Sequence, residues 1–153
     1  MVSQDDIAGN IKDFEMENYI ELVKDDLTGR MVVPMESMVG VEPKDFLTRR
    51  GVVYIYTLGN KILKIGETSR KLPQRLQDYN KRRKGNTGDG ELFQHLISCG
   101  TQDVVRMYLV FAGKQFLFEG DYFPTSSKLL EQIYIQKHLK LYGTLPPFNK
   151  VGW

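Results

Sequence analysis

The sequence has little cysteine and no long apolar run, and each absence excludes a class of protein. The 153-residue chain contains one cysteine, Cys99, which excludes an internal disulfide and a zinc site built from several cysteines. No apolar stretch reaches the roughly 18 residues needed to span a bilayer. The first residues, MVSQDDIAGN, lack the basic start and apolar stretch of a signal peptide. We therefore expect a cytoplasmic protein, and the chain length fits one domain.

Net charge is also small, but the charges are unevenly distributed. The formal charge of +2 is too low to indicate a nucleic-acid partner by itself. Acidic side chains far outnumber basic ones in residues 1–29, whereas basic side chains far outnumber acidic ones in residues 70–84. The bases of this second segment are Arg70, Lys71, Arg75, Lys81, Arg82, Arg83 and Lys84. Such a segment suits phosphate binding, and a solvated helix face is the alternative that charge alone leaves open.

Local patterns predict a small α/β (α+β) core preceded by a helical extension. The apolar spacing of residues 3–26 predicts a helix, and the segments 52–57 and 61–65, joined by turn residues at 58–60, predict paired strands. Further strands are expected at 31–33 and 104–111, with 116–118 extending the sheet or forming a ribbon. Helices are expected from Pro43, over 73–83 and over 126–142, with a loop at 84–91. This order favours a three-stranded, mainly antiparallel sheet flanked by helices.

The hairpin VVYIYTLGNKILKIG contains two residues that could act together. Tyr54 and Lys64 lie on adjacent predicted strands, and they face each other only if the connecting loop has an odd number of residues. A three-residue loop at 58–60 would pair them. A lysine ammonium beside a phenol lowers the phenol pKa from about 10, so the tyrosine could serve as a general base. The alternative is a packed strand tyrosine and a surface lysine.

Two predicted helices carry further candidates. Arg75, Tyr79 and Arg82 share one helix face, where an arginine could hold a phosphate bidentately. The alternative is an amphipathic helix with a basic outer side. Glu131 lies among apolar residues in LLEQIYI, so its carboxylate needs a partner. That partner could be a basic side chain or a divalent cation, since hard cations take oxygen ligands and often keep waters.

Taken together, these residues resemble the GIY-YIG nuclease superfamily. Val53-Tyr54-Ile55 stands for the first motif and Lys64-Ile65-Gly66 for the second. The arginine, the glutamate and the closing asparagine of the family correspond to Arg75, Glu131 and Asn149. The lysine at position 64 and the tyrosine at position 79 depart from most members and resemble the type II restriction endonuclease branch. The resemblance covers roughly residues 51–150.

The resemblance implies metal-assisted hydrolysis of double-stranded DNA. Tyr54, helped by Lys64, would deprotonate the attacking water, while Arg75 would stabilise the phosphate and Tyr79 would orient it. Glu131 would hold one Mg²⁺ per site, with Mn²⁺ tolerated. Asn149 and Gly66 would organise local structure. Phosphates or bases would be contacted by Arg70, Lys71, Lys81, Arg82, Arg83 and Lys84.

The expected organisation is a nuclease core at 51–153 with an insertion around 81–105, preceded by an extension at 1–50 for DNA recognition or dimerisation. A palindromic target would imply a homodimer. The resemblance also implies a cognate DNA methyltransferase in the same host. Two alternatives stay open: a structure-directed repair, homing or phage nuclease, and a non-catalytic nucleic-acid-binding domain on the same fold.

Overall fold

The chain folds around a five-stranded antiparallel sheet. The computed structural model describes residues 9–24, 31–74, 76, 104–112, 115–124 and 126–149. The strand order across the sheet is β2-β1-β5-β3-β4. Its strands are β1 (Tyr19–Lys24), β2 (Met31–Val32), β3 (Arg50–Leu58), β4 (Lys61–Lys71) and β5 (Val105–Phe111). The predicted α+β class with an antiparallel sheet is therefore confirmed, and the sheet is wider than three strands.

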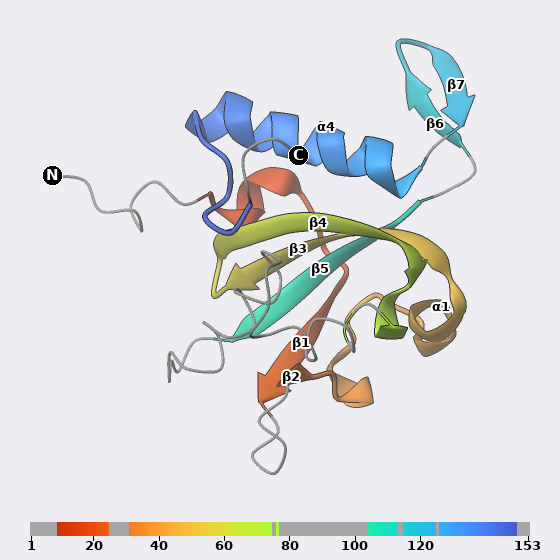
Figure 1. Cartoon of the computed structure of the whole chain (residues 1–153), viewed down its shortest axis with the longest axis vertical. Helices are drawn as coiled ribbons and strands as arrows, with labels where there is room; N and C mark the ends of the chain where they lie inside the picture. Colours follow the sequence, from red (N-terminus) through yellow and green to blue (C-terminus); the bar gives the residue numbers. More distant parts are fainter. Residues whose placement is uncertain are drawn as a thin grey trace, which may run out of the picture.

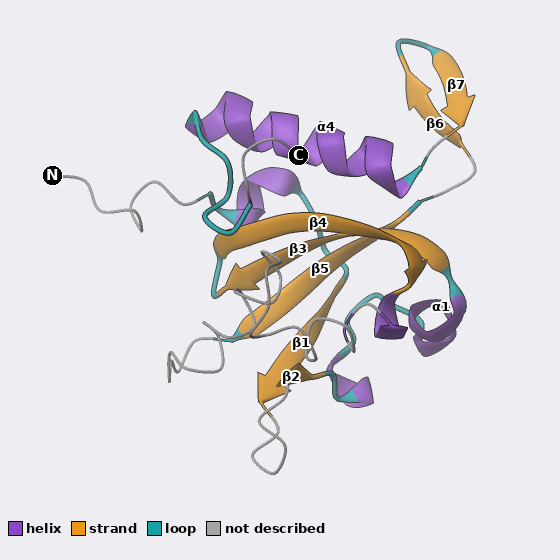
Figure 2. Cartoon of the chain, viewed as in Figure 1, coloured by secondary structure: helices purple, strands orange, loops and turns teal. Residues whose placement is uncertain are grey.

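The remaining elements lie on and beside this sheet (Figure 1, Figure 2). The elements with defined bounds in the described part of the chain are two α-helices, two short 3-10 helices and a separate two-stranded ribbon that projects from the body. Their bounds are α1 (Pro43–Thr48), α4 (Ser127–Tyr142), η2 (Ile11–Phe14), η3 (Met35–Ser37), β6 (Gln115–Phe118) and β7 (Asp121–Pro124). Within the described residues, no helix combines the length and apolar character that crossing a bilayer requires.

The interior strand β3, which lies between β5 and β4, is buried on both faces. Val53 and Ile55 pack with Ile135 of α4 on one face of the sheet. Tyr54 and Tyr56 pack on the other face, in a core that also includes Phe46 of α1. We call these the α4 face and the tyrosine face. The run VVYIYT thus has no polar side because helices and loops cover both faces of the strand.

Helix α4 begins and ends as its sequence predicts. The hydroxyl of Ser126 accepts a hydrogen bond from the backbone N–H of Leu129 at 3.1 Å. Gly143 adopts a left-handed conformation at φ 75°, and its N–H donates to the carbonyl of Leu139. Short helix α1 likewise begins at Pro43, where proline suits the first helical position.

The predicted N-terminal helix is wrong for the described part of that segment. Residues 11–14 form only the short 3-10 helix η2, which ends at Glu15 in a left-handed conformation with φ 54°. The chain then enters β1, where Tyr19 pairs with Tyr108 of β5. The predicted strands at 31–33 and 104–111 are confirmed, and residues 116–118 belong to the β6–β7 ribbon. The predicted helix at 73–83 lies largely, and the loop at 84–91 entirely, outside the described residues.

Both ends of the described chain cover the first half of β4, an edge strand of the sheet. The carbonyl of Gly9 accepts a hydrogen bond from the N–H of Ile62 at 2.7 Å, and Phe148 donates to the carbonyl of Leu63 at 2.9 Å. The side-chain amide of Asn149 makes two bonds to the backbone of Ile65, accepting at 2.9 Å and donating at 2.8 Å. Asn149 thus satisfies the edge as a neighbouring strand would.

Candidate active site

The hairpin does not pair Tyr54 with Lys64 as the sequence predicted. The connecting turn is Gly59-Asn60, because Leu58 is already opposite Lys61. A register shift follows between Tyr56 and Thr57. As a result Lys64 lies opposite Tyr56, and Tyr54 lies opposite Gly66. The three-residue loop is therefore wrong, and so is the direct pairing that depended on it.

The register shift nevertheless returns Lys64 to the side of the tyrosines. Thr57 is opposite Ile62 and Tyr56 is opposite Lys64, so Leu63 is the extra residue of a β-bulge. Residues opposite each other share a face, as do alternate residues of one strand. Tyr54, Tyr56 and Lys64 therefore share the tyrosine face. Lys64 is the diagonal neighbour of Tyr54, a spacing of about 7–8 Å that long side chains bridge.

Gly66 provides the space in which the ring of Tyr54 lies. A Cβ atom at position 66 would be only 2.4 Å from Cε2 of Tyr54 and 2.8 Å from its hydroxyl oxygen. The ring therefore crosses over β4 at the glycine, which places the phenol oxygen above an edge strand. Tyr54 is 1% exposed, and its ring meets the ring of Tyr56 edge to face at 5.3 Å. These contacts hold the phenol in one orientation.

Glu131 approaches β4 from the other face of the sheet. The hydroxyl of Ser127 at the start of α4 donates to Oε2 of Glu67 at 2.7 Å. Glu131 follows one helical turn after Ser127 and precedes the fully buried Ile135 by one turn, so it lies on the stripe of α4 that faces the sheet. Its side chain is half-buried. Glu131 and Tyr54 therefore approach β4 from opposite faces of the sheet.

Some predicted site residues lie outside the described part of the chain. They are Arg75, Tyr79, Lys81, Arg82, Arg83 and Lys84. Leu72 and Leu76, which bracket Arg75 in the sequence, are buried in the same core as Tyr54 and Tyr56. Arg70 is exposed and Lys71 is half-buried at the end of β4. The roles predicted for all these residues stay predictions.

Sequence reasoning missed Glu67 and Ser127. Glu67 directly follows Gly66, and its side chain points to the α4 face because its pairing partner is Val53. The hydrogen bond to Ser127 fastens the start of α4 to β4 and so fixes the helix turn that precedes Glu131. The sequence did contain a signal for Glu67. Successive residues of a strand face opposite sides of the sheet, so the polar residue directly after the motif glycine faces away from Tyr54.

Two residues at the other end of α4 have shifted pKa values. Burial lowers the pKa of His138, whose Nδ1 lies 2.6 Å from the carbonyl oxygen of Thr144. Burial also raises the pKa of Tyr142, whose hydroxyl donates to Asp13 and to the carbonyl of Asn10. These groups fasten neighbouring loops to the helix. They form a structural clamp far along α4 from Glu131.

The comparisons with known proteins support the fold. No protein-family model matches the chain, and no curated protein matches it. A solved structure of restriction endonuclease HPY188I in complex with product DNA is 22% identical, covers 95% of this chain and 90% of its own, and gives a TM-score of 0.53. A point mutant of bacteriophage T4 EndoII is 18% identical, covers 92% of this chain and 95% of its own, and gives a TM-score of 0.55. At these identities the likeness shows a shared fold.

Proposed function

We propose that this protein is a GIY-YIG endonuclease that cuts double-stranded DNA at a specific sequence, as type II restriction enzymes do. The observation that carries the proposal is the ring of Tyr54 lying on Gly66 at the sheet edge, with Lys64 on the same face. This arrangement explains why the two motifs need a tyrosine, a lysine and a glycine at these positions. The fold shared with a restriction endonuclease bound to product DNA adds independent support.

The donor atoms at the sheet edge suit a hard divalent cation. Glu131 and nearby Glu67 offer carboxylate oxygens, which Mg²⁺ and Mn²⁺ prefer. Among the described residues, no group of three or more histidine, cysteine, aspartate and glutamate side chains gathers into a closed metal cage. Glu131 would thus hold one Mg²⁺, with waters and phosphate oxygens completing its coordination. When bound, the ion stabilises negative charge on the phosphate and on the leaving oxygen.

The residues of the chain perform the proton transfer and position the phosphate. Tyr54 accepts a proton from a water molecule as the water oxygen attacks phosphorus. The ammonium group of Lys64 favours the phenolate form that can accept it. The bond from phosphorus to the 3′ oxygen breaks, and the 3′ oxygen takes a proton from solvent water, which leaves a 5′ phosphate and a 3′ hydroxyl. Arg75 stabilises charge on the phosphate and Tyr79 orients it, in the roles that the family resemblance gives them.

Target recognition would come from parts outside the hairpin. We assign it to residues 1–50 and to the insertion around 81–105 with its bases 81–84, whereas Arg70 and Lys71 at the end of β4 would contact backbone phosphates. A palindromic target requires two copies of this single-site chain, so we propose a homodimer acting in the cytoplasm. A restriction role also requires a cognate methyltransferase that protects the host DNA.

A second candidate function is a phage-type nuclease without a restriction role. The fold shared with bacteriophage T4 EndoII at a TM-score of 0.55 favours it. The same catalytic residues would serve both functions. The difference lies in the products, because a restriction enzyme gives discrete fragments, whereas a structure-directed or loosely specific nuclease gives ragged ones. A non-catalytic DNA-binding domain is the third possibility.

The test is incubation of the purified chain with a large phage DNA and Mg²⁺, with EDTA and the variant Glu131→Gln as controls. We expect discrete bands that disappear in EDTA and a rate at least about 100-fold lower in Glu131→Gln. Glu36→Gln, which alters an exposed glutamate of η3, is the matched variant and retains the rate. A smear would favour the phage-type nuclease. Intact DNA in both Mg²⁺ and Mn²⁺, with binding preserved in a gel shift, would contradict catalysis.

A further inference from the structure

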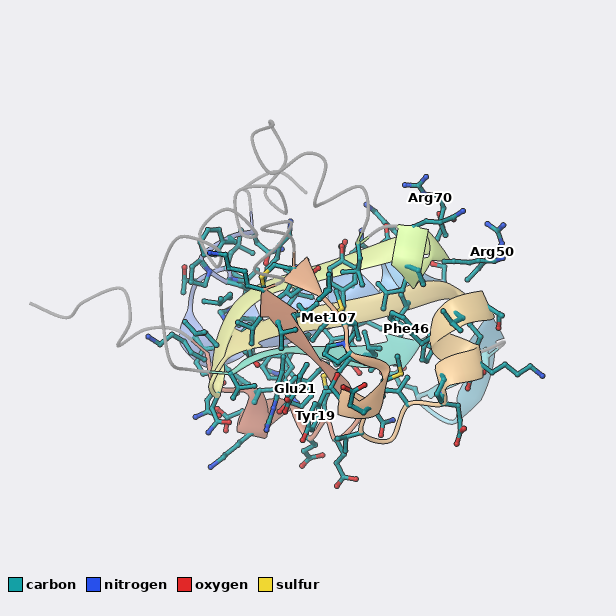
Figure 3. All side chains as sticks on the ribbon, turned by 90° about the horizontal axis from the view of Figure 1, so that it is seen from below. Tyr19, Glu21, Phe46, Arg50, Arg70 and Met107 are labelled. Carbon is teal, nitrogen blue, oxygen red and sulfur yellow. The ribbon has the colours of Figure 1, made fainter. Side chains whose placement is uncertain are left out.

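Four basic residues lie at the end of the β3–β4 pair that is farthest from the connecting turn, where β3 begins and β4 ends. Arg50 and Lys71 are opposite each other in the strand pair, and Arg49 and Arg70 are their neighbours. Arg49, Arg50 and Arg70 are exposed, and Lys71 is half-buried. Figure 3 shows Arg50 and Arg70 projecting from this end of the sheet, beside α1. We call these four residues the basic corner.

The backbone of the corner has a defined shape. A second register shift separates the pair Val52–Thr68 from the pair Arg50–Lys71, so two residues of β4, Ser69 and Arg70, stand opposite the single residue Gly51. Gly51 has a φ of 82°, a conformation that favours glycine. The hydroxyl of Thr68 accepts a hydrogen bond from the N–H of Arg70 at 3.1 Å. A bulge redirects the side chains that follow it, and this one directs Arg70 away from the sheet.

Arg49 is held in place by contacts of its own. Its Nη2 donates to the carbonyl of Ala112 at 3.3 Å, and its guanidinium lies over the ring of Phe111 at 4.9 Å. A guanidinium has five N–H donors, and this hydrogen bond uses one of them. The others stay available on a side chain whose position is already fixed, which reduces the entropy lost on binding.

Three charges of the corner are not neutralised by the described part of the protein. No carboxylate in the described ranges lies within ion-pair distance of Arg49, Arg50 or Lys71; the ion pair found in those ranges joins Arg106 and Glu21. The acids nearest in sequence are Asp45 of α1 and Glu67 of β4, and Glu67 accepts a hydrogen bond from the hydroxyl of Ser127. Adjacent cations of this kind on a fixed backbone suit an anionic partner with repeated charges.

We propose that the basic corner binds backbone phosphates of duplex DNA a few nucleotides to one side of the cleaved bond. This inference rests on the proposed function. The separation supports it: from Gly66 to Arg70 the strand advances about 13 Å at 3.3 Å per residue, close to four base-pair steps of 3.4 Å along one DNA strand. Proteins that bind single-stranded DNA stack its bases on exposed aromatic rings. The exposed large apolar side chains among the described residues are all aliphatic, which favours duplex DNA over single-stranded DNA. The corner therefore contacts the backbone and leaves base reading to other residues.

The test measures binding of a short duplex by the full chain carrying Glu131→Gln, which prevents cleavage. The corner variant adds Arg49→Gln, Arg50→Gln and Arg70→Gln. The matched control adds Lys128→Gln, Lys137→Gln and Lys140→Gln, which remove the same charge from helix α4. We expect the corner variant to bind roughly 10- to 100-fold more weakly, with a salt dependence shallower by about 0.9 for each phosphate that it no longer neutralises. The control should change little.

Replacing the same three arginines by lysine keeps the charges and tests for misfolding. It should retain most of the binding and of the salt dependence. Equal binding by the corner and control variants would overturn the inference, as would a loss confined to single-stranded DNA. The wild-type cleavage assay separates the two proposals. If the wild type does not cleave but the corner variant loses binding, the proposed function fails and the corner stands. If the wild type cleaves, and the three arginine-to-glutamine substitutions introduced without Glu131→Gln leave the cleavage rate unchanged, the corner fails.

Discussion

At the scale of single residues, Gly66 is important because the ring of Tyr54 occupies the space where a side chain would be. The family resemblance indicated that a glycine belongs at this position, but it gave no reason. The structure provides one: the phenol must cross the edge strand to reach the outer side of the sheet. A glycine selected for this contact tolerates no larger residue.

The variant Gly66→Ala tests this contact. Its new methyl group would lie 2.4 Å from Cε2 of a tyrosine that Tyr56 holds in place. We expect a loss of about 1–3 kcal/mol in the free energy of unfolding, as for other overpacked sites. Displacing the phenol by about 1 Å should lower the cleavage rate on the order of 100-fold. Urea unfolding and initial cleavage rates measure both effects.

Ser69→Ala is the control for Gly66→Ala, since Ser69 is an exposed residue of the same strand. It should leave stability and rate near the wild-type values. If Gly66→Ala also matched the wild type in both assays, the ring of Tyr54 would be free to move, and its fixed orientation could not explain the motif.

Two further residues show what the sequence could predict at this scale. Asn149 was expected to organise local structure, and its side-chain amide makes two hydrogen bonds to the backbone of Ile65. The partner of Lys64 was predicted wrongly. The prediction depended only on the number of residues in the connecting loop, and no residue pattern in the sequence marks the bulge at Leu63. A bulge depends on how the whole hairpin packs, which a local pattern does not contain.

At the scale of elements, the best predictions were those with strong local signals. Helix α4 has a serine cap, a terminal glycine and following prolines, and its bounds agree with the prediction. Residues 19–24 were predicted as helix because their apolar spacing fits a 3.6-residue period. They form β1 instead because β5, distant in sequence, provides hydrogen-bond partners. Contacts between distant segments override local propensity.

Helix α4 also contains a buried titratable group, His138, which makes stability depend on pH. Burial lowers the pKa of His138 in the folded protein below its ordinary value of 6.5. Between these two pKa values the unfolded chain binds more protons than the folded one, so stability falls as pH decreases below about 6.5. The groups that face His138 are Tyr142, Phe14 and the carbonyl of Thr144, and the pKa of Tyr142 is raised. Tyr142 therefore stays neutral in this pH range.

The variant His138→Gln tests this effect. Urea unfolding at pH 7.5 and pH 5.5 should show that the wild type loses more stability on acidification than the variant does, with a slope below about 1.4 kcal/mol per pH unit for one proton. Amide donors of the glutamine can still reach Thr144. An equal pH dependence in both proteins would show that His138 is not the group responsible.

At the scale of the whole molecule, the two halves of the edge strand β4 have different roles: one is covered by other parts of the chain, and the other carries the candidate site residues. The first half is covered by residues 9–10 and 148–149. The second half, beyond Ile65, carries Gly66 under Tyr54, Glu67 bound to α4, and the basic corner. The sequence predicted the motif residues of this edge. It could not predict the corner, because Arg49 and Arg50 join Arg70 only through the strand pairing.

The central claim is that the phenol of Tyr54 accepts the proton of the attacking water, and the most direct test is the single-turnover cleavage rate of Tyr54→Phe. Tyr142→Phe is the matched control, because it removes a phenol at the far end of α4. We predict a rate at least about 100-fold below wild type for Tyr54→Phe, the lower range for loss of a general base, and an unchanged rate for Tyr142→Phe. Cleavage by Tyr54→Phe at the wild-type rate would contradict the account.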